Sequence, residues 1–110
     1  MKYSYEIIGA KDIGLQYLEG QVRAAKPISA LKKAAQIGKN EFGELYRIRI
    51  VDGEIGIGKP VIEFFSRAAA KQRSTIEGMP ELKNPAATGL VRVRENNKWI
   101  AVKFSLESLI

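Results

Sequence analysis

The chain has 110 residues, a net charge of +6, and neither cysteine nor histidine. Its length suits one domain over residues 1–110, and 45% hydrophobic with 27% charged residues is ordinary for a globular protein. Without cysteine or histidine the chain lacks disulfides, thiolate metal sites and the commonest general base, so we expect no enzyme, no metal centre and no cofactor.

The compartment and the kind of partner follow from charge and hydropathy. The first residues carry no apolar segment of the secretory type, and no apolar run approaches the ~20 residues of a membrane span. We therefore expect a cytoplasmic protein without a membrane partner. The positive balance favours an anionic partner, either nucleic acid or an acidic protein surface.

The first part of the chain predicts two strands followed by a helix. Residues 3–8 alternate aromatic or apolar side chains with polar ones, and residues 15–24 form a second strand-like run. Ser29 is a good N-cap, because its hydroxyl can accept an amide hydrogen of the first turn. An apolar stripe at helical spacing follows it, and Gly38 is a natural helix end.

Residues 45–57 contain the clearest local signal. Asp52 and Gly53 lie between two alternating runs, a pattern typical of a hairpin with a type I′ turn. Such a hairpin would carry Arg47 and Arg49 on its outer face, opposite glycines. Its inner face would contribute five side chains to the core: Tyr46, Ile48, Ile50, Ile55 and Ile57.

Residues 60–73 allow two interpretations. Pro60 at a first helical position and the alanines that follow favour one helix, which we prefer. The alternative is a strand over 61–65 followed by a short helix that Ser66 caps. Residues 75–88 are interrupted by glycine and proline, which predicts an ordered loop.

A second hairpin is predicted towards the C-terminal end. Residues 90–95 alternate, residues 98–104 return, and Asn96 and Asn97 tolerate the left-handed backbone of a tight turn. The pairing buries Val91, Val93, Ile100 and Val102. The exposed face carries Arg92, Arg94, Trp99, Ala101 and Lys103. The expected fold class is α+β, a single antiparallel sheet built from hairpins and packed with one or two short helices.

The outer faces of the two hairpins form the main candidate site. If they share one sheet, they create a basic platform with one aromatic residue: Arg47, Arg49, Arg92, Arg94, Lys103 and Trp99. Guanidinium groups bind phosphates and an aromatic ring stacks on bases, so the platform predicts a nucleic-acid interface. The alternative is that a helix covers this face, or that the arginines pair with glutamates.

A second basic area is less specific. Its members are Lys32, Lys33, Lys59, Arg67, Lys71 and Arg73. Charge groups on helices are usually only solvated faces, so this area is a secondary candidate for nucleic-acid contact.

The element order also suggests a family. Two strands precede the Ser-capped, Ala/Lys-rich segment 29–36, which leads into Glu-Leu-Tyr-Arg-Ile at 44–48. This arrangement resembles small phage-encoded proteins, including anti-CRISPR inhibitors, over about the first half of the chain. The resemblance implies a non-catalytic protein that binds a host defence complex, in the cytoplasm of that host. It carries no functional residue with it.

Two functions are therefore expected. The charge and the two Arg-x-Arg segments predict a non-enzymatic, basic nucleic-acid-binding module that contacts single-stranded DNA, RNA or a DNA backbone. The alternative is a phage or mobile-element protein-interaction module that inhibits a host complex. Exposed edge strands would also allow two copies to pair as a homodimer.

Overall fold

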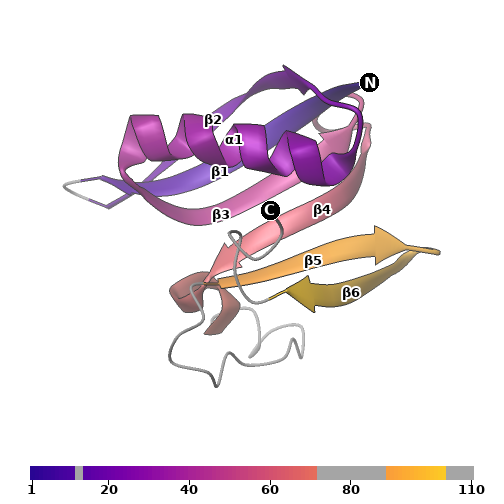
Figure 1. Cartoon of the computed structure of the whole chain (residues 1–110). Helices are drawn as coiled ribbons and strands as arrows, with labels where there is room; N and C mark the ends of the chain where they lie inside the picture. The colour runs from indigo at the N-terminus through magenta and orange to yellow at the C-terminus, as the bar shows by residue number, and fades with distance from the viewer. Residues whose placement is uncertain (12–13, 72–88, 104–110) are drawn as a thin grey trace.

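The computed structural model describes residues 1–11, 14–71 and 89–103. These residues form one six-stranded antiparallel sheet with the strand order β2-β1-β3-β4-β5-β6, and one long helix crosses its first half (Figure 1). The elements are β1 (Lys2–Lys11), β2 (Gly14–Arg23), α1 (Pro27–Phe42), β3 (Glu44–Asp52), β4 (Lys59–Ser66), β5 (Gly89–Glu95) and β6 (Lys98–Lys103). A helical turn over residues 67–71 follows β4. The predicted α+β class and the single antiparallel sheet are confirmed.

The helix is longer than its sequence signals predict. α1 begins at Pro27, after Lys26 in extended conformation, and no side chain caps it, so Ser29 is not the N-cap. It ends at Phe42, and Gly43 follows as the C-cap with a φ of 79°, which suits glycine. Gly38 lies inside the helix, at a position where a Cβ would collide with Leu45. That glycine therefore serves close packing and does not end the helix.

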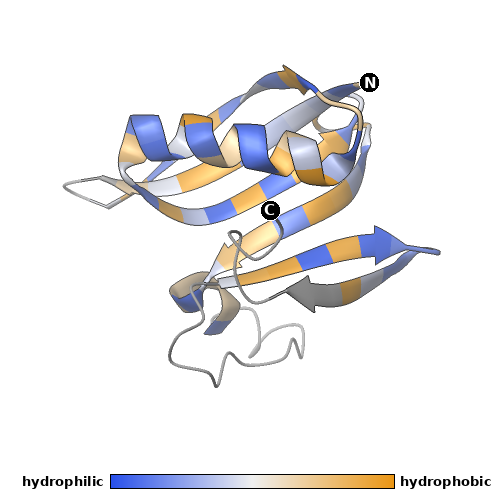
Figure 2. Ribbon diagram, viewed as in Figure 1, coloured by the Kyte–Doolittle hydropathy of each residue, from blue (hydrophilic) through white to orange (hydrophobic). Residues whose placement is uncertain are grey.

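The core lies between α1 and one face of the sheet. The buried face of α1 includes Ala30, Leu31, Ala34 and Phe42. The strands meet it with a band of apolar residues: Tyr3, Tyr5, Ile7, Ile48, Ile50, Ile62, Phe64 and Val91. Figure 2 shows the underlying alternation of hydrophobic and hydrophilic residues along β3 and β5. Burying each large side chain stabilises the fold by about 1.5–3 kcal/mol.

β3 and β4 do form an antiparallel pair around this position, but the predicted two-residue turn at Asp52-Gly53 and the return strand over 54–57 are wrong. β3 ends at Asp52, and a longer turn leads to β4. Within this turn, Glu54 O accepts hydrogen bonds from the amides of Ile57 (3.3 Å) and Gly58 (2.7 Å). Ile50 consequently pairs with Ile62, and Ile57 is 82% exposed. Glycines flank Ile57 on both sides, so this segment has little side-chain surface to pack as a central strand.

The preferred helix over 60–73 is also wrong, and the alternative is confirmed. β4 is a central strand, and its side chains from Ile62 to Phe65 are buried. The short helical turn begins after Ser66, whose Oγ accepts a hydrogen bond from the amide of Ala69 at 3.3 Å. Residues 61–65, which the sequence allowed as part of a helix, are mostly apolar because β4 is covered on both faces.

The second hairpin matches its prediction closely. Asn96 and Asn97 have φ values of 51° and 63°, and Arg94 pairs with Trp99. A register shift after Val91 places it opposite Lys103. Ile100 was predicted to be buried but is 45% exposed, because α1 packs on β1 to β4 and the β5–β6 hairpin extends beyond it (Figure 1). The predicted loop 75–88 lies outside the described residues.

Candidate nucleic-acid interface

The sheet face away from α1 carries a cross-strand row of charges. The strand registers align one residue from each of five neighbouring strands, in the order Glu19, Glu6, Arg49, Glu63, Arg92. Side chains aligned in this way are close enough to interact. The predicted arginines therefore do share one face, but carboxylates lie beside and between them.

Glu63 joins two of the platform arginines. Its Oε2 accepts a hydrogen bond from Arg49 Nε at 3.0 Å, and its Oε1 accepts bonds from Arg92 Nε and Nη2 at 3.1 and 2.8 Å. The Glu63 side chain is fully buried, and those of Arg49 and Arg92 are 31% and 9% exposed. The prediction that Arg92 is exposed is wrong. Arg49 and Arg92 are the glutamate-paired arginines of the alternative interpretation.

Sequence reasoning missed Glu63 because it placed this residue in a helix. In a strand, the same glutamate lies on the face opposite Ile62 and Phe64, and so on the arginine side. The signal that could have found it is the position of one acidic residue within a continuous apolar run. A charged residue in a buried strand requires a partner of opposite charge.

Arg47 lies at a covered part of the same face. Its Cζ is 6.0 Å from the ring centroid of Phe65, which pairs with it across β3 and β4. Phe65 is fully buried in a small second cluster with Ala69, Ala70 and Leu90. The helical turn 67–71 thus covers this end of the face, and the platform residues that the structure describes do not form one continuous open surface.

Among the platform side chains that the structure describes, only Arg94 is exposed, and Trp99 lies beside it. Arg94 is exposed, and its Cζ lies 5.2 Å from the Trp99 ring centroid, as the predicted hairpin register requires. Arg92 approaches the same ring, with its Cζ 4.3 Å from the centroid. Trp99 is half-buried, so two guanidinium groups hold an indole ring at the surface. The backbone of Lys103 continues β6, and its side chain lies outside the described part.

A groove lies beside this pair, between the start of β4 and the tip of the β5–β6 hairpin. It has a volume of about 510 Å³ and is lined by Lys59, Pro60, Val61, Arg94, Asn96 and Asn97. We call it the Arg94 groove. Lys98, at the start of β6, is exposed next to the hairpin turn. The groove therefore combines cations, side-chain amides and an adjacent aromatic ring.

The three cations in or near the groove differ in their cross-strand neighbours. Lys59 pairs with Asp52 across β3 and β4, and Lys98 pairs with Glu95 across the hairpin. Arg94 instead pairs with Trp99 on β6. On the β4 side, the register that pairs Ile62 with Val93 places it next to Val61, and neither neighbour is acidic. Arg94 is thus the groove cation whose cross-strand neighbours do not offset its charge.

The structure scatters the second basic area. Lys32 and Lys33 lie on α1, on the opposite side of the sheet. Lys59 begins β4, whereas Arg67 and Lys71 lie in the helical turn after its other end. Arg73 lies outside the described residues. These side chains do not form one surface. The length of β4 separates Lys59 from Arg67 and Lys71, and the sheet separates all three from the α1 lysines.

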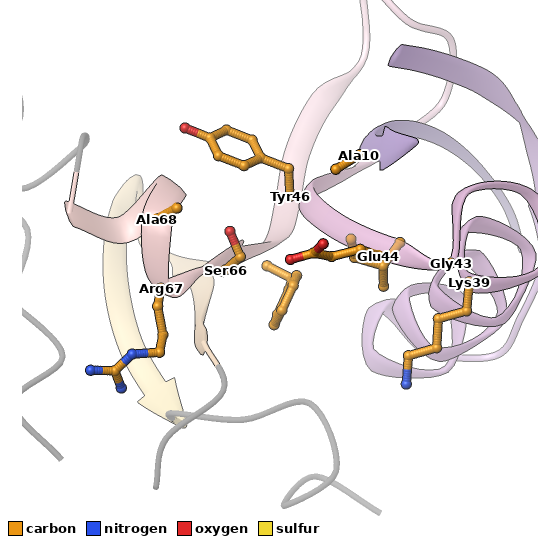
Figure 3. A pocket seen from close by; sticks show the side chains of 10 residues that line it. Ala10, Lys39, Gly43, Glu44, Tyr46, Ser66, Arg67 and Ala68 are labelled. Atoms are coloured by element: carbon orange, nitrogen blue, oxygen red, sulfur yellow. The ribbon is translucent and has the colours of Figure 1, made fainter. Parts of the chain in front are cut away.

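Arg67 instead lines a second cavity, of about 450 Å³, between the end of α1 and the helical turn. Figure 3 shows Glu44 and Ser66 directed towards its middle, with Lys39 on one side and Arg67 on the other. Tyr46 and Ala10 complete its upper wall in this view. The residues that line this cavity carry both signs of charge, whereas the charged residues that line the Arg94 groove are both positive.

The described residues contain neither a group of three or more acidic side chains that could hold a metal ion nor a helix long and apolar enough to span a membrane. No protein-family model matches the chain, and comparisons with curated proteins and with solved structures find no match. The resemblance to phage-encoded inhibitors therefore stays a prediction.

Proposed function

We propose that this chain is a non-enzymatic module that binds single-stranded nucleic acid through the Arg94 groove. The observation that supports it best is the exposed Arg94 guanidinium beside Trp99, at the edge of a groove that Lys59 also lines. A guanidinium group and an indole ring both offer flat surfaces on which bases stack.

The chemistry of the groove suits a nucleotide chain better than an acidic protein. Lys59 and Arg94 would contact phosphates, and the side-chain amides of Asn96 and Asn97 carry donors and acceptors for base edges. An acidic protein surface would use the cations but would leave the amides and the ring without a specific role.

Charge on the rest of this face limits the path of the ligand. Glu6 and Glu19 lie side by side on β1 and β2, and their carboxylates repel phosphates. The proposed path therefore runs over β4, β5 and β6 and does not cross β1 and β2. This is narrower than the platform expected from the sequence, because Glu63 holds Arg49 and Arg92.

Binding of fluorescently labelled single-stranded RNA, single-stranded DNA and duplex DNA tests the proposal by anisotropy at two salt concentrations. The two groove cations, as two phosphate contacts, predict a log–log salt slope of about −1.4 for single strands. Arg94→Ala should weaken single-strand binding roughly tenfold, which corresponds to one lost stacking contact. Lys59→Ala should reduce the slope by about 0.7.

Lys71→Ala is the matched control, because it removes one exposed positive charge at the other end of β4. It should leave single-strand affinity nearly unchanged. Equal losses for Lys71→Ala and Arg94→Ala would show that binding is unspecific and would refute the groove. Absence of binding to all three nucleic acids at low salt would reject the function and leave the host-protein inhibitor as the alternative.

A further inference from the structure

β2 is an edge strand with little built-in protection against pairing. It runs for ten residues in unbroken register with β1, and it contains neither proline nor lysine. Its outer face exposes Leu15 and Tyr17, at 58% and 54%. Natural edge strands are usually short, bulged, or marked by proline or lysine, because an open edge is a template for another strand.

Two hydrogen bonds identify which backbone groups of β2 face outwards. The amide of Ala24, which follows the strand, donates to Met1 O at 3.0 Å and so faces β1. Arg23 O faces the other way and accepts a hydrogen bond from Lys33 Nζ at 2.5 Å. The direction of the backbone N–H and C=O groups alternates along a strand. The backbone groups that also point away from β1 are therefore those of Leu15, Tyr17, Glu19 and Gln21.

Lys33 thereby closes one end of the edge. The Arg23 carbonyl is already occupied, so the open segment runs from residue 15 to residue 21. Leu18 lies at its midpoint. An antiparallel strand with its own midpoint at Leu18 would satisfy all the outward groups of this segment.

We propose that β2 pairs with β2 of a second copy, antiparallel, with Leu18 on the two-fold axis. Leu15 then faces Gln21 of the second copy, and Tyr17 faces its Glu19. The two Leu18 side chains meet on the α1 side of the sheet, where each already packs against its own core. The two sheets become one continuous sheet, and nothing in this pairing involves the Arg94 groove.

Side-chain chemistry selects this register and a second copy as the occupant. The Tyr17 hydroxyl donates to Glu19 Oε2 within the chain at 2.7 Å, so the same pair is compatible across the axis. A register centred on Glu19 would place two carboxylates opposite each other, which is destabilising. A register centred on Gly20 would recruit Arg23, whose carbonyl Lys33 holds.

Disulfide trapping tests the register. Because the chain has no cysteine of its own, every disulfide formed must join introduced cysteines. Residues opposite each other at a non-hydrogen-bonded position have Cα atoms about 4.5 Å apart, within the range of a disulfide. Leu18→Cys should form a covalent dimer under mild oxidation, and Glu19→Cys should not. A mixture of Tyr17→Cys and Glu19→Cys should form the mixed dimer, which checks the register at exposed positions. Preferential homodimers of Glu19→Cys would overturn it.

Sedimentation velocity of the full chain tests the dimer itself. Gln21→Pro removes an outward amide that pairs only in the dimer, and an edge strand tolerates proline at such a position. We expect the unmodified chain and Gln21→Ala to dimerise with rising concentration, and Gln21→Pro to stay monomeric with an unchanged circular dichroism spectrum. A monomeric unmodified chain at about 1 mM, the weak limit of association, would refute the proposal, whether or not nucleic acid binds.

Discussion

Arg92 donates two hydrogen bonds to the same carboxylate oxygen of Glu63, from Nε at 3.1 Å and from Nη2 at 2.8 Å. This pair joins β4 to β5, and both side chains are buried. It therefore connects the half of the sheet under α1 to the hairpin that carries Arg94.

Replacing Glu63 should destabilise the fold strongly. Glu63→Gln keeps the shape of the side chain but removes the buried carboxylate charge to which Arg92 is bound, and loss of one partner of a buried pair costs about 3–5 kcal/mol. Urea unfolding followed by circular dichroism measures the loss. Glu19→Gln, at an exposed position, should change the free energy of unfolding by less than about 0.5 kcal/mol. Equal stability of the two variants would contradict a structural role for Glu63.

Ionisation of Tyr17 should occur at unusually high pH. Partial burial and the hydrogen bond to Glu19, together with the negative charge of Glu6, raise the pKa of Tyr17 above the usual tyrosine value of about 10. The folded state thus favours the neutral phenol. Its contribution to stability is complete below the usual tyrosine pKa and is lost as the pH rises towards the raised value.

Ultraviolet titration at alkaline pH measures this shift. The difference between the unmodified chain and Tyr17→Phe gives the titration curve of Tyr17 alone. Glu19→Gln should move that curve to lower pH, because it removes a charge beside the phenol. A Tyr17 curve with the midpoint of a free tyrosine would argue against the contact with Glu19.

The β5–β6 turn should depend on residues that accept positive φ. Asn96 has a φ of 51°, and Asn97 has a φ of 63°. A β-branched residue is strained in this conformation, so Asn97→Val should lower the free energy of unfolding by roughly 1–2 kcal/mol. Asn97→Gly should leave it within a few tenths of a kcal/mol. Thermal unfolding compares the two, and an unchanged Tm for Asn97→Val would exclude the left-handed turn.

Gly9 should resist substitution because α1 packs directly on it. A Cβ at Gly9 would overlap the ring of Phe42 at the end of the helix. Gly9→Ala should therefore cost about 1–3 kcal/mol by overpacking. In the Phe42→Leu background the same substitution should cost less, because the smaller side chain leaves room for the methyl group. Strictly additive losses in the double variant would indicate that the two residues do not touch.

Part of the candidate site could be predicted from the sequence, and part could not. The Arg94–Trp99 pairing was predicted from the turn at Asn96-Asn97, because a tight turn sets the register of the residues next to it. The environment of Arg49 and Arg92 was not predicted, because it depends on Glu63, which lies in a strand between them. β3 precedes that strand and β5 follows it, and both connections are longer than a two-residue hairpin turn.

The amino-acid sequence by itself determined the features that neighbouring residues decide: the two N-terminal strands, the apolar face of the helix and the β5–β6 hairpin. Only the tertiary structure decided that residues 59–66 are a central strand, and thereby that Glu63 holds two of the arginines while Arg94 stays exposed. The physical reason is burial on both faces. An apolar run suits a helix and a doubly covered strand equally, and the choice between them lies with the surfaces that close over it.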